Sequence, residues 1–441
     1  QLKKKLKKRL DIDREERHSL HSLLTSLGLS LCLWILLAIA PSSLLPIKAI
    51  AAPFPSIAQV NSAQPTSSAM TSPTEILSRL FTEPELQREW FADSFLAQIS
   101  LGEISQITQG IVSSVGSYQS IEDVPNGFVL TFSRGTVATH LALNERGQIT
   151  GLLFETPQLV GLSLDAVIYE LSSLPGKTHL LATRNGEDVA VLNADEPLAV
   201  GSTFKLLILQ ELQDQIAAGQ HQWTDVIPLK EEWKSLPSGI LHTWPTGSQL
   251  TLESLATLMI SQSDNTATDH LLNIVGRKTV EARSPRNTPF LTTREAFVLK
   301  DPANRSVLRR WRRSNERRSF LSPLAALPLP AVSIFNEGPQ AIDVEWFMSA
   351  RELCSAMDAV ADLPLMGINP GLVDDSQWQK VAYKGGSEPG VENFTTQLTD
   401  DKGTLCVSAT WNNESGIDEL QFSTLYRSLI ESAAEQASEG L

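Results

Sequence analysis

Cysteine and histidine are scarce in this chain of 441 residues, which contains three cysteines and seven histidines. So few cysteines exclude a scaffold built on disulfide bonds. The histidines are scattered and form no H-E-x-x-H or H-x-H-x-D pattern, so we expect no metal site and no zinc hydrolase. Hydrophobic residues make up 42% and charged residues 20% of the chain, a globular composition that excludes wholesale disorder.

The charge of the chain is unevenly distributed. The formal net charge is −14 at pH 7, but residues 1–51 carry nine basic and four acidic side chains, a charge of +5. The remaining residues therefore carry a charge of −19. An acidic body repels the phosphate backbone, so we expect no nucleic-acid partner.

Residues 1–51 have the order of features found in export signals. A basic stretch leads into an apolar run of about 18 residues, Leu23 to Ala40, and Ala49 and Ala51 have the spacing that a signal peptidase recognises. We interpret the segment as a signal peptide cleaved near Ala51, or as an uncleaved membrane anchor, because a run of this length just spans a bilayer. In either case we expect the body of the protein in the periplasm or outside the cell.

A tether and a small first domain are expected after this segment. Residues 52–73 are rich in Pro, Ser and Thr and carry no charge, which is typical of a flexible linker. Residues 74–157 predict an α+β domain, which we interpret as a packing or spacer module. Two helices and four strands are expected in it, over 75–99, 103–114, 118–122, 127–133, 136–143 and 149–154.

Residues 158–441 predict a larger domain whose sheet is built from both ends of the domain. A short linker spans 157–162, Ser163 caps a helix, and a hairpin turns at Asn185-Gly186. A helical block, three strands and a closing helix follow, over 200–360, 379–384, 393–398, 404–411 and 416–435. A sheet interrupted in sequence by a helical block is an α/β arrangement.

A serine and a lysine three residues apart open a helix in this domain, at Ser202 and Lys205. This spacing places both side chains on one helical face. A desolvated lysine can take the proton of a neighbouring hydroxyl and so activate it as a nucleophile. The free N–H groups at the helix start favour developing negative charge.

Two further motifs follow in order along the chain. Ser263-Asp264-Asn265 lies at the break between two helical patterns, and Lys384-Gly385-Gly386 is expected at the end of a strand. Alone, the first is a capping turn and the second a flexible strand end. With the serine–lysine pair they indicate an acyl-transfer site, in which we expect Asp264 to shape the turn.

These three motifs resemble the S-x-x-K, S-D-N and K-T-G signature of class A β-lactamases and penicillin-binding proteins. The likeness extends to three neighbouring stretches, Leu198–Gly201, Pro237–Ile240 and Met259–Ala267. It implies an α/β sandwich, with an antiparallel sheet flanked by helices and an all-helical subdomain, over about 164–435. Residues 74–157 resemble the steroid-isomerase-like module of two-domain serine hydrolases from the clavulanic-acid cluster.

The resemblance implies a role for each motif residue. Ser202 attacks the substrate carbonyl to form an acyl-enzyme, and Lys205 accepts its proton. Ser263 relays a proton to the leaving group, and Asn265 holds the lysine and the substrate amide. Lys384 orients Ser263 and attracts the substrate carboxylate.

The resemblance also implies an oxyanion hole, formed by the backbone N–H groups of Ser202 and Ser387 beside Gly385 and Gly386. One departure from the family pattern lies here. Gly385 replaces the threonine of K-T-G, so the hydroxyl that contacts a substrate carboxylate is absent.

The deacylation machinery departs further from the family pattern, because no E-x-x-L-N sequence follows the second motif. The efficient β-lactamases use that glutamate to activate the deacylating water. Glu295 is a candidate substitute, although Thr292 and Glu295 equally have the spacing of a capping box. Glu337 is a second, weaker candidate. The residues needed for acylation are therefore present, but no base is assigned to the deacylation step.

The reaction indicated is hydrolysis of a β-lactam through a Ser202 acyl-enzyme, in a monomer without a cofactor. The same residues fit a penicillin-binding D-alanyl peptidase or an esterase, so a β-lactam and a D-Ala-type peptide or ester remain alternative substrates. A non-catalytic envelope-binding protein is the rival from another class. Retention of both lysines and both serines speaks against it.

Two features remain open at this point. Cys354 and Cys406 can pair if the fold brings them together, which the sequence does not show. Seven arginines surround Trp311, and we interpret them as a solvated helical face, or as a contact for an anionic envelope polymer or lipid surface. They are Arg305, Arg309, Arg310, Arg312, Arg313, Arg317 and Arg318.

Overall fold

A computed structural model describes residues 72–336 and 338–439, which divide into two compact units, 72–160 and 161–439. The predicted signal or anchor segment lies outside the described residues, as does nearly all of the predicted linker. Within the described ranges, no helix combines the length and the apolar character needed to cross a bilayer.

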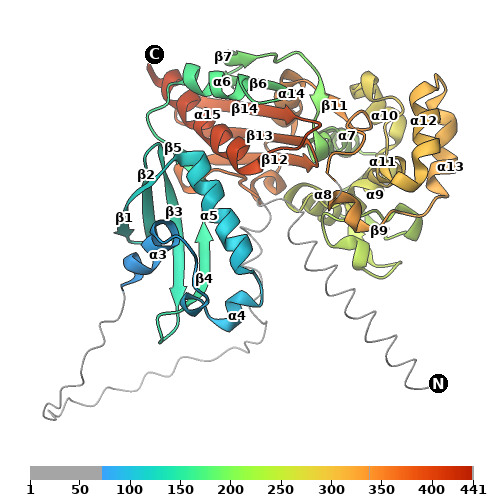
Figure 1. Cartoon of the computed structure of the whole chain (residues 1–441). Coiled ribbons are helices and arrows are strands. Elements are labelled where there is room, and N and C mark those ends of the chain that lie inside the picture. Colours follow the sequence, from blue (N-terminus) through green and yellow to red (C-terminus); the bar gives the residue numbers. More distant parts are fainter. Residues whose placement is uncertain (1–71, 337, 440–441) are drawn as a thin grey trace, which may run out of the picture. The chain divides into compact units, whose positions relative to one another are not determined.

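The first unit packs helices against a five-stranded antiparallel sheet in the order β1-β2-β3-β4, with β5 paired to β3 (Figure 1). The helices are α3 (Pro73–Thr82), α4 (Asp93–Leu96) and α5 (Leu101–Val115), with a 3-10 turn at Arg88–Trp90. The strands are β1 (Tyr118–Val124), β2 (Gly127–Phe132), β3 (Gly135–Leu143), β4 (Ile149–Phe154) and β5 (Gln158–Leu159). The four predicted strands are therefore present.

Two predictions for this unit were wrong in detail. The single helix expected over 75–99 ends at Thr82, because Pro84 lacks an N–H and keeps the preceding Glu83 extended, at ψ 143°. The linker expected over 157–162 begins with strand β5, which extends the sheet by pairing with β3.

The second unit contains a five-stranded antiparallel sheet in the order β12-β13-β14-β6-β7 (Figure 1). Its strands are β6 (Lys177–Arg184), β7 (Glu187–Leu192), β12 (Lys380–Glu388), β13 (Val391–Asp400) and β14 (Gly403–Asn412). The β6–β7 hairpin turns at Asn185 and Gly186, whose φ angles of 55° and 85° suit a two-residue turn. Strand β14 pairs with β6, so both ends of the unit meet in one sheet, as predicted.

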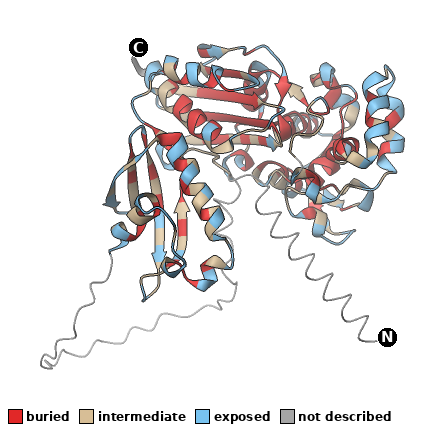
Figure 2. Cartoon of the chain, viewed as in Figure 1, coloured by how far each residue is buried: buried red, intermediate tan, exposed pale blue. Residues whose placement is uncertain are grey.

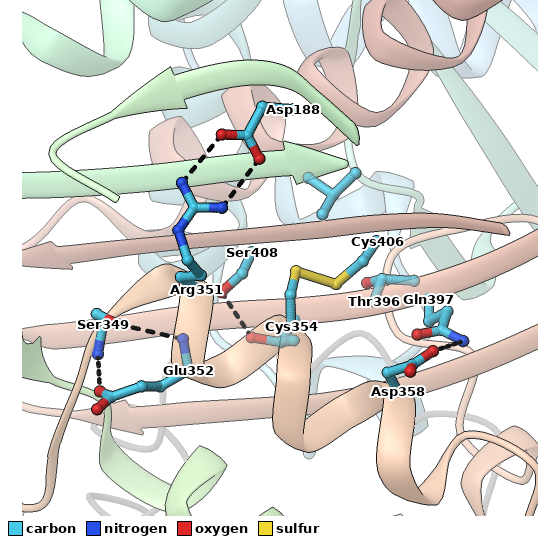
Figure 3. Close-up of a disulfide and its surroundings, with 12 residues drawn as sticks. Asp188, Ser349, Arg351, Glu352, Cys354, Asp358, Thr396, Gln397, Cys406 and Ser408 are labelled. Carbon is cyan, nitrogen blue, oxygen red and sulfur yellow. Dashed lines mark hydrogen bonds and ion pairs between the residues drawn. A yellow bond between two sulfur atoms is a disulfide. The ribbon is translucent and has the colours of Figure 1, made fainter. Parts of the chain in front are cut away.

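Helices cover both faces of this sheet. Helices α6 (Leu164–Ser172) and α15 (Glu419–Glu439) contact each other and the sheet, and α14 (Ala350–Val360) contacts β13 and β14 while packing on α7 (Lys205–Ala217). A disulfide joins Cys354 of α14 to Cys406 of β14, with 5.9 Å between their Cα atoms (Figure 3). Figure 3 also shows Arg351 of α14 paired with Asp188 of β7.

The rest of the unit is largely helical and contains many buried residues (Figure 2). A large apolar core is formed by the hydrophobic ones. The helices of this region are α8 (Leu252–Ser261), α9 (Asn265–Val275), α10 (Arg277–Arg283), α11 (Thr293–Lys300), α12 (Arg305–Arg313) and α13 (Leu321–Ala325). Four short strands form two pairs, β8 (Leu198–Ala199) with β11 (Phe347–Met348) and β9 (Val226–Pro228) with β10 (Gln249–Thr251). An antiparallel sheet flanked by helices, with a helical region, confirms the predicted fold class.

The arginine-rich segment forms α12 and the turn that follows it. Leu308 and Trp311 are buried, whereas all seven arginines are exposed. Arg312 pairs with Asp343, and Arg318 pairs with Glu281. The segment is thus a helix with one apolar face and one solvated basic face.

Candidate active site

The predicted nucleophile lies in a 3-10 turn, Gly201–Phe204, that leads directly into α7. Ser202 is half-buried and Lys205 is fully buried. Packing of an aromatic ring holds the turn in place, because the ring of Phe204 stacks on Trp346 at 3.7 Å between centroids. The Val200 N–H also donates to the Trp346 carbonyl, at 3.0 Å. Local packing therefore fixes the position of Ser202.

Lys205 is the centre of the hydrogen-bond network in this site. Its Nζ donates to the Ser263 carbonyl (2.5 Å), the Ser263 Oγ (3.0 Å) and the Asn265 Oδ1 (2.7 Å). Three predicted site residues are thus in direct contact. No hydrogen bond joins Lys205 to Ser202 within the described ranges, because these three acceptors use every hydrogen of the ammonium group.

Burial changes the protonation of this lysine. Desolvation lowers the pKa of Lys205 to about 7, against the opposing charges of Asp264, Asp269 and Glu388. At neutral pH, Lys205 is therefore a neutral amine in a large fraction of the molecules. A neutral amine has two hydrogens and a lone pair, so one of the three contacts must be released and a lone pair becomes available to accept a proton.

Lys384 approaches the same serine from the sheet. Its Nζ donates to the Ser263 Oγ at 3.1 Å and to the Gly385 carbonyl. Burial, together with the charge of Lys205, holds the pKa of Lys384 well below its usual range. Because the Ser263 Oγ accepts from both lysines, its own hydrogen is free to be donated elsewhere.

Asp264 builds the turn that presents Ser263, as predicted. Its Oδ2 accepts from the backbone N–H groups of Ile240 (2.7 Å) and Leu241 (2.9 Å), and its Oδ1 accepts from that of Ala267 (2.8 Å). These bonds cap α9 and join the second motif to the Pro237–Ile240 stretch. They also hold Ser263 at a φ of 54°, in the left-handed region that non-glycine residues rarely adopt.

The third motif lies inside β12 rather than at the end of a strand, so its predicted position was wrong. Pairing with β13 continues through Gly386–Asn393 and Ser387–Glu392 to Glu388. The strand runs on because β13 satisfies its backbone groups up to that point.

Glycine at position 386 allows β12 to lie against the nucleophile turn. A Cβ at Gly386 would lie 2.6 Å from the Ser202 nitrogen and 2.7 Å from the Thr203 nitrogen, too close for any side chain. A Cβ at Gly201 would lie 3.1 Å from the Ser387 nitrogen. The close contact between β12 and the turn therefore places the two segments that carry the predicted oxyanion donors, Ser202 and Ser387, next to each other.

Comparison with known proteins places this geometry in context. Residues 164–319 match a family model described as Beta-lactamase enzyme family, a range that contains Ser202, Lys205, Ser263 and Asn265. The second unit carries a β-lactamase-like fold. No curated protein matches the chain.

Solved structures of this fold are similar to the chain at low sequence identity. A β-lactamase from Sphaerobacter thermophilus DSM 20745 is 21% identical, covers 63% of this chain and 99% of its own, and has a TM-score of 0.46. A protein described as PBP-A is 17% identical, with coverage of 63% and 96% and a TM-score of 0.40. A β-lactamase from Xanthomonas campestris pv. campestris is 14% identical, with coverage of 62% and 99% and a TM-score of 0.43.

Within this β-lactamase-like fold, the structure gives Glu295 a stabilising role. Its carboxylate accepts two hydrogen bonds from Arg277, at 2.8 and 2.9 Å, and one from the Thr292 N–H, at 2.8 Å. The capping box is present, and both carboxylate oxygens are occupied. We therefore abandon Glu295 as a deacylating base. Glu337, the other candidate, lies outside the described residues.

The glycine at the centre of the third motif also has a structural reason. A Cβ at Gly385 would overlap the hydroxyl of Tyr383 and lie 3.0 Å from its Cζ. A threonine here would require the Tyr383 side chain to shift.

Proposed function

We propose that this chain is a serine hydrolase that opens a β-lactam ring through an acyl-enzyme on Ser202. The observation that carries the proposal is the continuous network in which Lys205 and Lys384 both donate to the Ser263 Oγ. Two buried lysines with lowered pKa values are unfavourable for stability and are typical of catalytic sites.

In the proposed acylation, the Ser202 Oγ attacks the carbonyl carbon while its proton passes to the neutral amine of Lys205. The N–H groups of Ser202 and Ser387 donate to the developing oxyanion, a contribution of roughly 3–4 kcal/mol for each such donor. When the ring C–N bond breaks, Ser263 donates its hydrogen to the leaving nitrogen. The proton held on Lys205 then restores the Ser263 hydroxyl.

The same steps fit a D-alanyl peptidase or an esterase, which differ only in the leaving group. A non-catalytic binding protein fits less well, because two buried lysines with lowered pKa values are typical of catalytic sites and are not required for binding.

Labelling with a fluorescent penicillin tests the proposal. We expect one label per chain, on the tryptic peptide 185–205 that contains Ser202, as mapped by mass spectrometry. Turnover of a chromogenic cephalosporin is measured in parallel. A persistent label without turnover would favour the penicillin-binding alternative, and ester cleavage without labelling would favour the esterase. If neither labelling nor ester cleavage occurs, the hydrolase proposal is wrong.

The rate of labelling should rise with pH between about 6 and 8 with a midpoint near 7, because only the neutral amine of Lys205 accepts the proton of Ser202. Rapid-mixing measurements of the acylation rate at constant ionic strength will show this. A flat profile, or one that falls with pH, would contradict a role for Lys205 as the base.

A further inference from the structure

Deacylation requires a base that the family resemblance does not supply, and the surroundings of Lys205 contain one candidate. Three carboxylates act electrostatically on Lys205, those of Asp264, Asp269 and Glu388. Both oxygens of Asp264 accept backbone N–H groups, as described above. Asp269 accepts from the Thr293 N–H (2.7 Å), the Thr293 hydroxyl (2.9 Å) and the Arg294 N–H (2.9 Å). Hydrogen bonds from protein groups thus occupy both oxygens of each of these two carboxylates.

Glu388 is different because it accepts no hydrogen bond from a protein group in the described part of the chain. Its contact is an ion pair in which the Oε2 lies 3.5 Å from the Lys300 Nζ. The Oε1 therefore remains available to a water molecule. The side chain is 14% exposed, so it is largely buried but remains accessible to water.

Strand geometry places Glu388 on the side of β12 that faces the nucleophile. Side chains alternate along a strand, so Lys384, Gly386 and Glu388 share one face. Lys384 contacts Ser263 on this face, and Gly386 lies against the Ser202 nitrogen. Glu388 follows Gly386 by two residues, roughly 6–7 Å further along the strand.

The immediate surroundings of Glu388 suit a carboxylate that binds water. Lys300 lies between Glu388 and the buried Glu345, so one ammonium group is shared by two carboxylates and Glu388 keeps part of its negative charge. A cavity of about 10 Å³ is lined by Lys300, Glu388, Phe297 and Pro389 among others. That is about the space required by a single water molecule.

We propose that Glu388 is the base that activates the water in hydrolysis of the Ser202 acyl-enzyme; this inference rests on the proposed function. The carboxylate takes one proton from water as the water oxygen bonds to the acyl carbon. The bond from that carbon to the Ser202 Oγ then breaks, and the Oγ takes the proton held by Glu388. One water is consumed, Glu388 returns to its carboxylate form, and Lys205 remains a neutral amine.

Glu388→Gln tests this role, because the carboxamide keeps the shape of the side chain but cannot take the proton. We expect labelling by the fluorescent penicillin within about twofold of the wild-type rate. Release of the label should slow by roughly 10²- to 10³-fold, within the usual range for general base catalysis. The two rates are measured separately, by rapid mixing and by loss of label after the free probe is removed, with Ser202→Ala as the blank.

Glu392→Gln is the matched control. Glu392 pairs with Ser387 across the sheet and so faces away from Glu388, although it is also buried. Burial raises the pKa of Glu392 well above its usual range, which favours the neutral carboxyl that glutamine resembles. We expect wild-type rates of labelling and release in this variant.

The outcomes separate the two proposals. If wild type is never labelled, the proposed function fails first. If wild type and Glu388→Gln release the label at equal rates, or if a folded Glu388→Gln variant cannot be labelled, the proposed function stands and the role of Glu388 is overturned. Thermal unfolding of each variant shows that it is folded.

Discussion

Replacing Lys205 by methionine should slow acylation by a fluorescent penicillin by roughly 10²- to 10⁴-fold, while the protein stays folded. The variant loses the amine that we propose accepts the proton of Ser202. It retains a side chain of similar length in a site that is fully buried. The measurement is the rate of covalent labelling at pH 8, where the wild-type amine is largely neutral.

The stability of this variant should change little, because two effects oppose each other. The lowered pKa of Lys205 shows that burial penalises its charged form, and methionine removes that penalty. The Ser263 carbonyl still accepts from the Ser238 hydroxyl (2.8 Å), and the Ser263 Oγ still accepts from Lys384. The Asn265 Oδ1 loses its donor, at about 1–3 kcal/mol for a buried acceptor.

Two comparisons complete this experiment. Lys278 is exposed on α10, and Lys278→Met should label at the wild-type rate.

Wild-type stability should also rise with pH between about 7 and 10.5, because the unfolded chain binds the Lys205 proton in that window and the folded chain does not. Lys205→Met should lose that part of the pH dependence. If Lys205→Met labels at the wild-type rate, a group other than Lys205 accepts the proton of Ser202.

Removing the disulfide by replacing both Cys354 and Cys406 with alanine should lower the free energy of unfolding by about 4 kcal/mol. The bond closes a loop across a sequence separation of 52, and opening that loop increases the entropy of the unfolded chain. It also joins α14 directly to the centre of the sheet (Figure 3). The measurement is chemical unfolding followed by tryptophan fluorescence.

Only the transition of the second unit should shift, because both cysteines belong to it. A reducing agent should bring wild type to the stability of the double variant and leave the variant unchanged. Penicillin labelling should persist in the variant under native conditions. A loss of less than 1 kcal/mol would show that packing alone holds α14 on the sheet.

Local signals predicted much of the fold. The turn at Asn185-Gly186, the alternation along the β-strands and the cap at Ser163 depend on residues close in sequence, and each is present. The prediction of one helix over 75–99 was wrong because it followed the helical spacing of the apolar residues and ignored Pro84. That proline is a local signal that a helix ends, and the sequence shows it. The position of the third motif was wrong for a different reason, since the end of β12 depends on its pairing with β13.

The sequence by itself determined the three motifs, their order and the elements that carry them. It could not show that Lys205 bonds to Ser263 and Asn265, about 60 residues away, or that Cys354 meets Cys406. It also gave no signal for Glu388, which belongs to no motif and gains its surroundings from β12 and Lys300. Caps, turns and periodicity act over a few residues, whereas burial, pKa shifts and hydrogen-bond networks depend on groups that only the packed tertiary structure brings together.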